Sequence, residues 1–359
     1  MGVYTFRRVI LSIPVLLGIL VVTFMIARLI PGDPCHSILG ERATPAQCEA
    51  FDKRMGLDKP IPIQLGIYLN DVIHGDFGDS IRFKRPVSLL LVEKLPVTIE
   101  LGAIALFLAT LIGVPLGMIS ALKRNTKVDV ATMVGANIGV SMPVYWLGLM
   151  LQYLFAIQLR DTFLWLPPSG RLTAGLKSIP FYEVWGWAAE PETIRDTLFT
   201  FFSKMYLFNS LITWDIEIFK DVMTHMFLPA VALSTIPMAI IARITRSSML
   251  EVLGQDYIRT AKAKGVREFS LITKHAFRNA MLPIVTIVGL QAGTLFAGAV
   301  LTETIFSLAG VGRSLFDAIT GRDFPVIQGF TVVIAILYVL VNLIVDISYA
   351  FIDPRIKLE

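Results

Sequence analysis

The strongest constraint on this chain is a series of separate apolar runs, each about 20 residues long, as needed for a helix to cross a hydrocarbon layer of roughly 30 Å. Only 17% of the residues are charged, whereas about a quarter are charged in soluble domains. Because a helix satisfies its backbone hydrogen bonds internally, we predict an all-α integral membrane protein with six transmembrane helices. The predicted spans are Val9–Ile30, Ile99–Leu122, Val130–Ala156, Met226–Ile244, Leu282–Phe306 and Phe330–Phe351.

The distribution of Lys and Arg predicts which loops face the cytoplasm, because cytoplasmic loops carry an excess of positive charge. Two arginines precede the first run, and basic residues dominate 123–129 and 243–280. The long stretches 31–96 and 159–225 are slightly acidic. We therefore predict an N-in/C-in, multi-pass protein of the plasma membrane with two long extracytoplasmic segments. The net charge of +4 follows from this topology and gives no reason to expect a nucleic-acid partner.

These spans and loops divide the chain into three parts. Residues 1–30 comprise the cytoplasmic N-terminus and a first anchor, which is too long for a signal peptide and lacks a small-residue cleavage site. Residues 31–96 form the first extracytoplasmic segment, and residues 97–359 form a core with the other five helices. We expect this core to contain an extracytoplasmic insertion at about 159–225 and a cytoplasmic coupling loop at about 245–281.

The two cysteines, Cys35 and Cys48, both fall in the first extracytoplasmic segment. An oxidising exterior would allow them to form a disulfide that closes a short loop. Two free thiols in a polar loop are the alternative, and the sequence leaves both open.

One cytoplasmic stretch, "DYIRTAKAKGVREFSLITKHAFRNAMLP", begins at Asp256 and lies between two apolar runs. The positive-inside rule explains its charge but not its helical pattern. Asp256 is a candidate N-cap, and Gly265 is placed to end a short helix. Tyr257, Ile258 and Ala261 would share one face of that helix.

A second helical stretch follows the first and is predicted to run from Glu268 to Ala280 and to stop at Pro283, which has no backbone donor. A passive loop would need neither helix. Two ordered helices at the cytoplasmic face therefore favour a docking surface for another protein.

At this stretch the sequence resembles binding-protein-dependent ABC importer permeases, in the branch that transports dipeptides, oligopeptides and nickel. Ala261, Gly265 and Leu282–Pro283 carry the likeness to the cytoplasmic loop of that family. Motifs similar to the same branch follow in order along nearly the whole chain, including "RRVILSIPVLLGILVVTFMIARLIPGDP", "GDFGDSI", "SMPVYWLGLML" and "GAVLTETIFSLAGVGRSLFDAITGRDFPVIQG". Arg259 departs from the general loop pattern, which has Glu there, and 171–222 resembles the branch least.

The resemblance implies the permease subunit of an ATP-driven importer, which forms the translocation path for short peptides. Its partners would be a second homologous permease, two cytoplasmic ATPase subunits and an extracytoplasmic substrate-binding protein, with membrane lipid around the helices. The resemblance also implies that 256–265 is a coupling helix seated in a groove of an ATPase subunit. The residues expected to form it are Asp256, Tyr257, Ile258, Arg259, Ala261, Lys262, Lys264 and Gly265.

The chain lacks the sequence pattern of a phosphate-binding loop, so we expect ATP hydrolysis in partner subunits and do not expect an enzyme. The nearest stretch, "LAGVGRS" at 308–314, has Arg in place of Lys and no preceding strand. The four histidines are scattered along the chain, without the spacing of a metal site. We therefore predict no catalytic residue, cofactor or metal.

Polar residues within the predicted spans are candidates for lining the translocation path. They are Gln152, Gln291, Glu303 and Asp346. The carboxylates would alternatively lie near an interface or cap a neighbouring helix, and the glutamines would only bond an adjacent helix. Three glycines in the fifth predicted span favour close helix packing, with pore lining as the alternative: they are Gly289, Gly293 and Gly298.

Other functions are compatible with parts of this pattern. The same permease architecture imports nickel, oligosaccharides or other solutes in related systems. Peptide is the substrate that the resemblance implies, and no single residue of the sequence identifies the substrate. An ion-coupled secondary transporter would need an inverted repeat and paired broken helices, and a membrane enzyme would need clustered acidic residues or histidines. The long outer segments would receive the binding protein or would only pack over the bundle.

Overall fold

The computed structural model is almost entirely helical apart from turns, loops and one isolated bridge between Asp79 and Pro86. Five of its helices are long and apolar enough to cross a membrane, and the number becomes six if one bent pair counts as a single span. The predicted all-α membrane fold is therefore confirmed. The structure describes residues 2–29, 35, 40, 43–187, 193–296 and 299–352.

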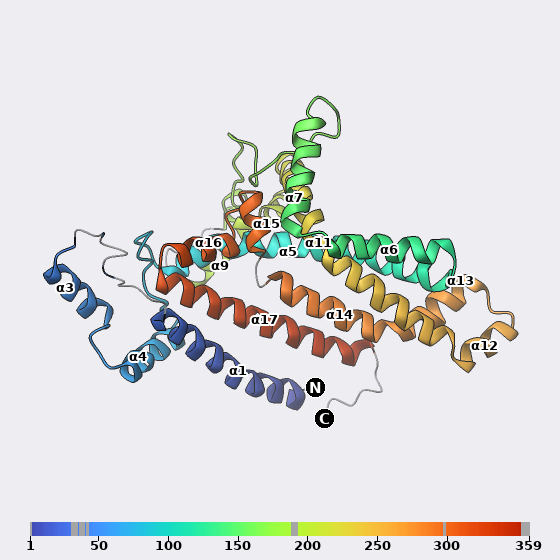
Figure 1. The fold of residues 1–359 in the computed structure, drawn as a ribbon, viewed down its shortest axis with the longest axis horizontal. Coiled ribbons are helices and arrows are strands. Elements are labelled where there is room, and N and C mark those ends of the chain that lie inside the picture. Colours follow the sequence, from blue (N-terminus) through green and yellow to red (C-terminus); the bar gives the residue numbers. More distant parts are fainter. Residues whose placement is uncertain are drawn as a thin grey trace.

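Two long helices, α5 (Val87–Leu122) and α11 (Ile216–Leu253), run parallel and form the centre of the bundle (Figure 1). Small residues let them approach closely. A Cβ on Gly113 would lie 2.7 Å from the Met238 carbonyl oxygen, and a Cβ on Gly117 would overlap the next turn of α11. Any larger side chain at these glycines would force the two helices apart.

The remaining long helices are α1 (Gly2–Leu29), α14 (Arg278–Phe296) and α17 (Phe324–Ile352). In Figure 1 they lie side by side beneath α5 and α11, with α17 in contact with both α1 and α14. Where α14 meets α17, a Cβ on Gly289 would overlap Val345, and one on Gly293 would lie 2.7 Å from the Tyr338 ring. The predicted packing role of these glycines is confirmed, and Gly298 lies outside the described residues.

The predicted span Val130–Ala156 is wrong as a single straight helix. The structure divides it into α6 (Lys127–Ser141), α7 (Val144–Gln152) and a π-helix, η1 (Tyr153–Gln158), with a bend of 96° after Ser141. The chain bends there because a residue that precedes proline disfavours the helical conformation, and Met142 is extended in front of Pro143.

Other predicted boundaries also move. The central helices α5 and α11 begin earlier than predicted, inside the stretches 31–96 and 159–225 that we assigned to extracytoplasmic segments. The predicted span Leu282–Phe306 is interrupted, because α14 ends at Phe296 and a separate α15 (Val300–Ile305) follows. Hydropathy marks the apolar part of a helix and cannot show how far the helix extends beyond it.

The extracytoplasmic side carries several short helices. Cys35 and Cys48 form a disulfide there, with their Cα atoms 5.4 Å apart. Of the two alternatives left open by the sequence, the structure therefore shows the disulfide and not two free thiols. The short helices are α3 (Pro45–Met55), α4 (Ile61–Ile73), α8 (Phe181–Val184), α9 (Ile194–Lys204), α10 (Tyr206–Thr213), α15 and α16 (Val311–Thr320).

Candidate functional site

The predicted coupling helix is α12 (Asp256–Ala263), which follows α11 at the cytoplasmic end of the bundle (Figure 1). Ile258 attaches it to the bundle. Its side chain is 5% exposed and belongs to an apolar cluster with Met249 of α11 and Leu271 of the π-helix η2 (Leu271–Phe277). Ile258 therefore packs α12 directly against the helices that precede and follow it.

The two ends of α12 differ in how well the sequence predicted them. Asp256 is not the N-cap: Gln255 occupies that position without a side-chain cap, and Asp256 is the first helical residue. There its negative charge favours the positive end of the helix dipole. Gly265 ends the helix as predicted, because its φ of +75° is in the left-handed region and its N–H donates to the Lys262 carbonyl oxygen at 3.0 Å.

The exposed surface of α12 carries basic side chains. Arg259 contacts Asp256 at 3.4 Å, but the two side chains are 77% and 96% exposed, so this ion pair contributes little. Lys262 and Lys264 are exposed as well, and Phe269 in the following helix α13 (Glu268–Ser270) is 74% exposed. The helix α12 and the residue that follows it therefore offer cations to a partner, and the neighbouring α13 offers an aromatic ring.

The second predicted helix does not stop at Pro283. It runs on from α13 through η2 into α14, with Pro283 inside α14. The wider π turns of η2 lie directly beside α12. A hydrogen bond of 3.0 Å from Asn279 Nδ2 to the Tyr257 hydroxyl ties α14 to α12.

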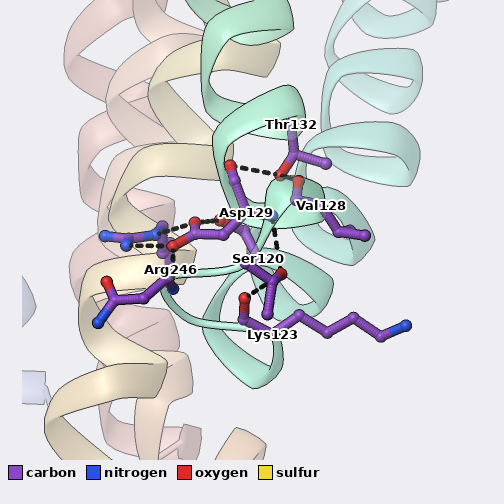
Figure 2. A network of polar contacts seen from close by, with 8 residues as sticks. Ser120, Lys123, Val128, Asp129, Thr132 and Arg246 are labelled. Carbon is purple, nitrogen blue, oxygen red and sulfur yellow. Dashed lines mark hydrogen bonds and ion pairs between the residues drawn. The ribbon is translucent and has the colours of Figure 1, made fainter.

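A charge pair with a buried carboxylate lies in the same cytoplasmic region (Figure 2). Asp129, at the start of α6, is 4% exposed and accepts hydrogen bonds from Arg246 Nε and Nη2 of α11, each 2.8 Å long. The Ser120 hydroxyl of α5 and the Asn125 backbone N–H also donate to this carboxylate. The Asp129 side chain thus joins α5, α6 and α11, and α11 is the helix that precedes α12.

The sequence alone does not predict this pair. A signal for Asp129 is visible, because Thr126 precedes it by three residues in a helix-start pattern, and Thr126 is indeed the N-cap of α6. Arg246 looks like any other cytoplasmic arginine in the sequence. Only the packing of α6 against α11 shows that the two side chains meet.

Among the predicted path residues, Glu303 lies in a tight enclosure on the outer side. Its carboxylate is fully buried and accepts hydrogen bonds from the Thr98 hydroxyl at 2.7 Å and the Arg313 N–H at 2.9 Å. Cβ atoms on Gly310 and Gly312 would collide with it or press against it, which explains the two glycines in "LAGVGRS". Burial raises the pKa of Glu303 above its ordinary value, although these hydrogen bonds act in the opposite direction.

The other three path residues make different contacts. Gln152 donates from Nε2 to the carbonyl oxygens of Pro168 and Ile305, at 2.7 and 3.1 Å, and so joins outer loops. Gln291 is half-buried on α14. Asp346 pairs with Arg8 at 3.2 Å, between α17 and α1.

The outer insertion is attached by a second charge pair that the sequence alone does not predict. Arg171 Nη2 lies 2.5 Å from the Glu100 carboxylate of α5, and their side chains are 12% and 3% exposed. The same nitrogen donates to the Lys204 carbonyl oxygen at 2.9 Å, and the guanidinium stacks 4.0 Å from the Tyr206 ring centre. The one feature of the sequence that could have indicated this pair is Glu100, an acidic residue at the edge of a predicted span.

Comparison with known proteins identifies the class of this molecule. Residues 113–358 match the family described as binding-protein-dependent transport system inner membrane component, and residues 1–102 match its N-terminal membrane component. The chain belongs to this family of transport permeases. It is therefore a multi-pass membrane permease, and the family description implies a binding protein and an ATPase as its partners.

Similar proteins cover the permease from end to end. It is 45% identical to the dipeptide transport system permease protein DppB of Alkalihalophilus pseudofirmus, over 99% of both chains. It is 42% identical to the protein of the same name in Escherichia coli strain K12, over 99% of this chain and 98% of the relative. It is also 42% identical to the di/tripeptide transport system permease protein of Pseudomonas aeruginosa, over 98% and 97%.

Proposed function

We propose that this permease forms half of the translocation path of an ATP-driven importer of short peptides. The path would be completed by a second homologous permease, and two separate ATPase subunits would hydrolyse ATP. A binding protein would deliver the peptide at the extracytoplasmic face. The observation that carries the proposal is α12, a basic and exposed helix whose Ile258 is buried in the transmembrane bundle.

The mechanism that this arrangement supports is alternating access. An ATPase that holds the exposed face of α12 would move the helix when ATP binds and its two copies close. Ile258 passes that movement to α11 and η2 by packing, and the Asp129–Arg246 pair makes α5 and α6 move with α11. The path would then open outward, and hydrolysis would reset it.

Peptide is the proposed substrate because the relatives named above are dipeptide or di/tripeptide permeases with similarity along the whole chain. Nickel or an oligosaccharide is the alternative within the same architecture. An ion-coupled secondary transporter is the less favoured alternative, since it gives the exposed basic helix no role.

The test is reconstitution of the permease in proteoliposomes with its partner permease, ATPases and binding protein. We expect ATP-dependent uptake of a radiolabelled dipeptide, and no uptake when residues 256–265 are deleted from a chain that still reaches the membrane in normal amounts. Normal uptake by the deletion variant would contradict the coupling role. Uptake of nickel or oligosaccharide without any peptide would contradict the proposed substrate.

A further inference from the structure

A cavity of about 390 Å³ lies on the outer side, between the end of α1, the α3–α4 segment and the start of α17. Its volume falls in the range of small-molecule sites, roughly 300–1,000 Å³. Aromatic rings form much of its wall, among them Phe24 and Tyr68, which stack with centroids 5.6 Å apart, and Phe324. We call this cavity the outer pocket.

Two polar groups in the wall of the outer pocket have no hydrogen-bond partner within the described part of the chain. They are the Tyr68 hydroxyl and the Gln328 amide nitrogen. Gln328 is only 8% exposed, and burial raises the pKa of Tyr68 to about 12, so this hydroxyl stays protonated at neutral pH. Buried donors without acceptors cost free energy, so both call for acceptor oxygens on a bound molecule.

The outer pocket also carries charges of both signs. Lys59 and Asp71 line it, and neither pairs with an opposite charge among the described residues. Lys53, another lining residue, is different because it already pairs with Glu49 at 2.8 Å. A ligand with one ammonium and one carboxylate group would be complementary to Lys59 and Asp71 together.

We propose that the outer pocket binds a short zwitterionic peptide directly, without the binding protein. The peptide ammonium would face Asp71 and its carboxylate would face Lys59. Peptide carbonyl oxygens would accept from Tyr68 and Gln328, and an apolar side chain would lie against the rings. This inference rests on the proposed function, because it takes the cargo of the importer to be the ligand.

The test is equilibrium binding of radiolabelled alanyl-phenylalanine to the purified importer complex, without binding protein and without nucleotide. We expect saturable binding that weakens at least about tenfold in Tyr68→Phe and in Gln328→Leu, because a site built around hydrogen bonds loses affinity when a donor is removed. The same peptide with acetylated and amidated ends should bind weakly to the wild type. Matched controls are Tyr153→Phe and Gln158→Leu, a bonded pair on η1 that does not line the pocket.

Loss of binding can be separated from misfolding. Each pocket variant removes a buried group without a partner, so the ligand-free complex should unfold at the same temperature as the wild type or higher. Equal peptide affinity in the pocket variants and controls would overturn the inference. So would binding of phosphatidylethanolamine that excludes the peptide, because a lipid headgroup also carries both charges.

The outcome also distinguishes this inference from the proposed function. If the wild type imports dipeptide with its binding protein while the pocket variants bind dipeptide as well as the wild type, only the outer pocket is overturned. If the wild type imports no peptide, the proposed function is overturned. Dipeptide binding that depends on Tyr68 and Gln328 would support the outer pocket even then.

Discussion

Asp129 is a buried carboxylate with four hydrogen bonds, two of them from Arg246. Such a charge is tolerable because its partners replace the water that burial removes. Glu303 accepts from the Thr98 hydroxyl and from backbone N–H groups, and it has no charged donor among the described residues, so burial dominates its pKa. A carboxylate therefore serves as an ion-pair member at the cytoplasmic end and as an enclosed hydrogen-bond acceptor without a charged partner at the outer end.

Replacing Arg246 with alanine should destabilise the permease by about 2 kcal/mol, because a buried carboxylate loses two charge-assisted hydrogen bonds. The measurement is thermal unfolding of the purified complex. Arg243→Ala is the matched control, since Arg243 lies on the same helix and its hydrogen bond to Asn137 is exposed. Equal unfolding temperatures for the two variants would contradict a stabilising role for the pair.

The raised pKa of Glu303 predicts a pH dependence of stability. Between the ordinary value of 4.5 and the higher value in the fold, the native state binds more protons than the unfolded state, so stability falls as pH rises. Glu303→Gln cannot titrate and should remove this part of the slope. Unfolding temperatures across a pH series above 4.5 measure it, with the exposed Glu217→Gln as control; an unchanged slope in Glu303→Gln would refute the assignment.

At the scale of elements, α12 has one buried side chain and an otherwise exposed surface. Ile258 belongs to the apolar cluster beneath it, whereas Arg259, Lys262 and the following Lys264 are exposed. The C-terminal turn of α12 depends on local chemistry, since Gly265 adopts a positive φ without strain. The anchoring depends on α11 and η2, which form the other sides of the cluster.

Ile258→Ala should loosen α12 from the bundle, because truncating a buried isoleucine costs about 2–4 kcal/mol. We expect the ATPase activity of the assembled complex to lose its stimulation by the loaded binding protein, while the ATPase subunits still copurify. Ala263→Gly is the matched control, since Ala263 lies in the same helix but is exposed. Full stimulation in the Ile258→Ala variant would show that packing at this position does not transmit the movement.

At the scale of the whole molecule, two charge pairs hold the core to its surroundings at opposite ends. Arg171 and Glu100 attach the outer insertion to α5, and Arg246 and Asp129 join α11 to α6. Both pairs involve the central helices, which pack against each other along their length. The two central helices are therefore connected by ionic contacts to the outer insertion at one end and to α6 at the other.

Arg171→Ala should release the outer insertion, because it leaves Glu100 buried without a countercharge at a cost of about 3 kcal/mol. Limited proteolysis from the extracytoplasmic side should then cut within 159–225 faster than in the wild type. Arg160→Ala, which changes an exposed arginine of the same insertion, should leave the rate unchanged. Identical cleavage rates in all three proteins would contradict the attachment.

The properties that are local along the chain could be predicted from the sequence. Apolar runs are long enough to cross a membrane, Lys and Arg mark the cytoplasmic loops, and Gly265 ends α12, because each depends on neighbouring residues alone. Tertiary packing decided which charges meet. Glu100 and Arg171 are separated by 71 residues and Asp129 and Arg246 by 117, so hydropathy and charge patterns contain no information about their contact. Helix packing brings them together, and burial makes each depend on its partner.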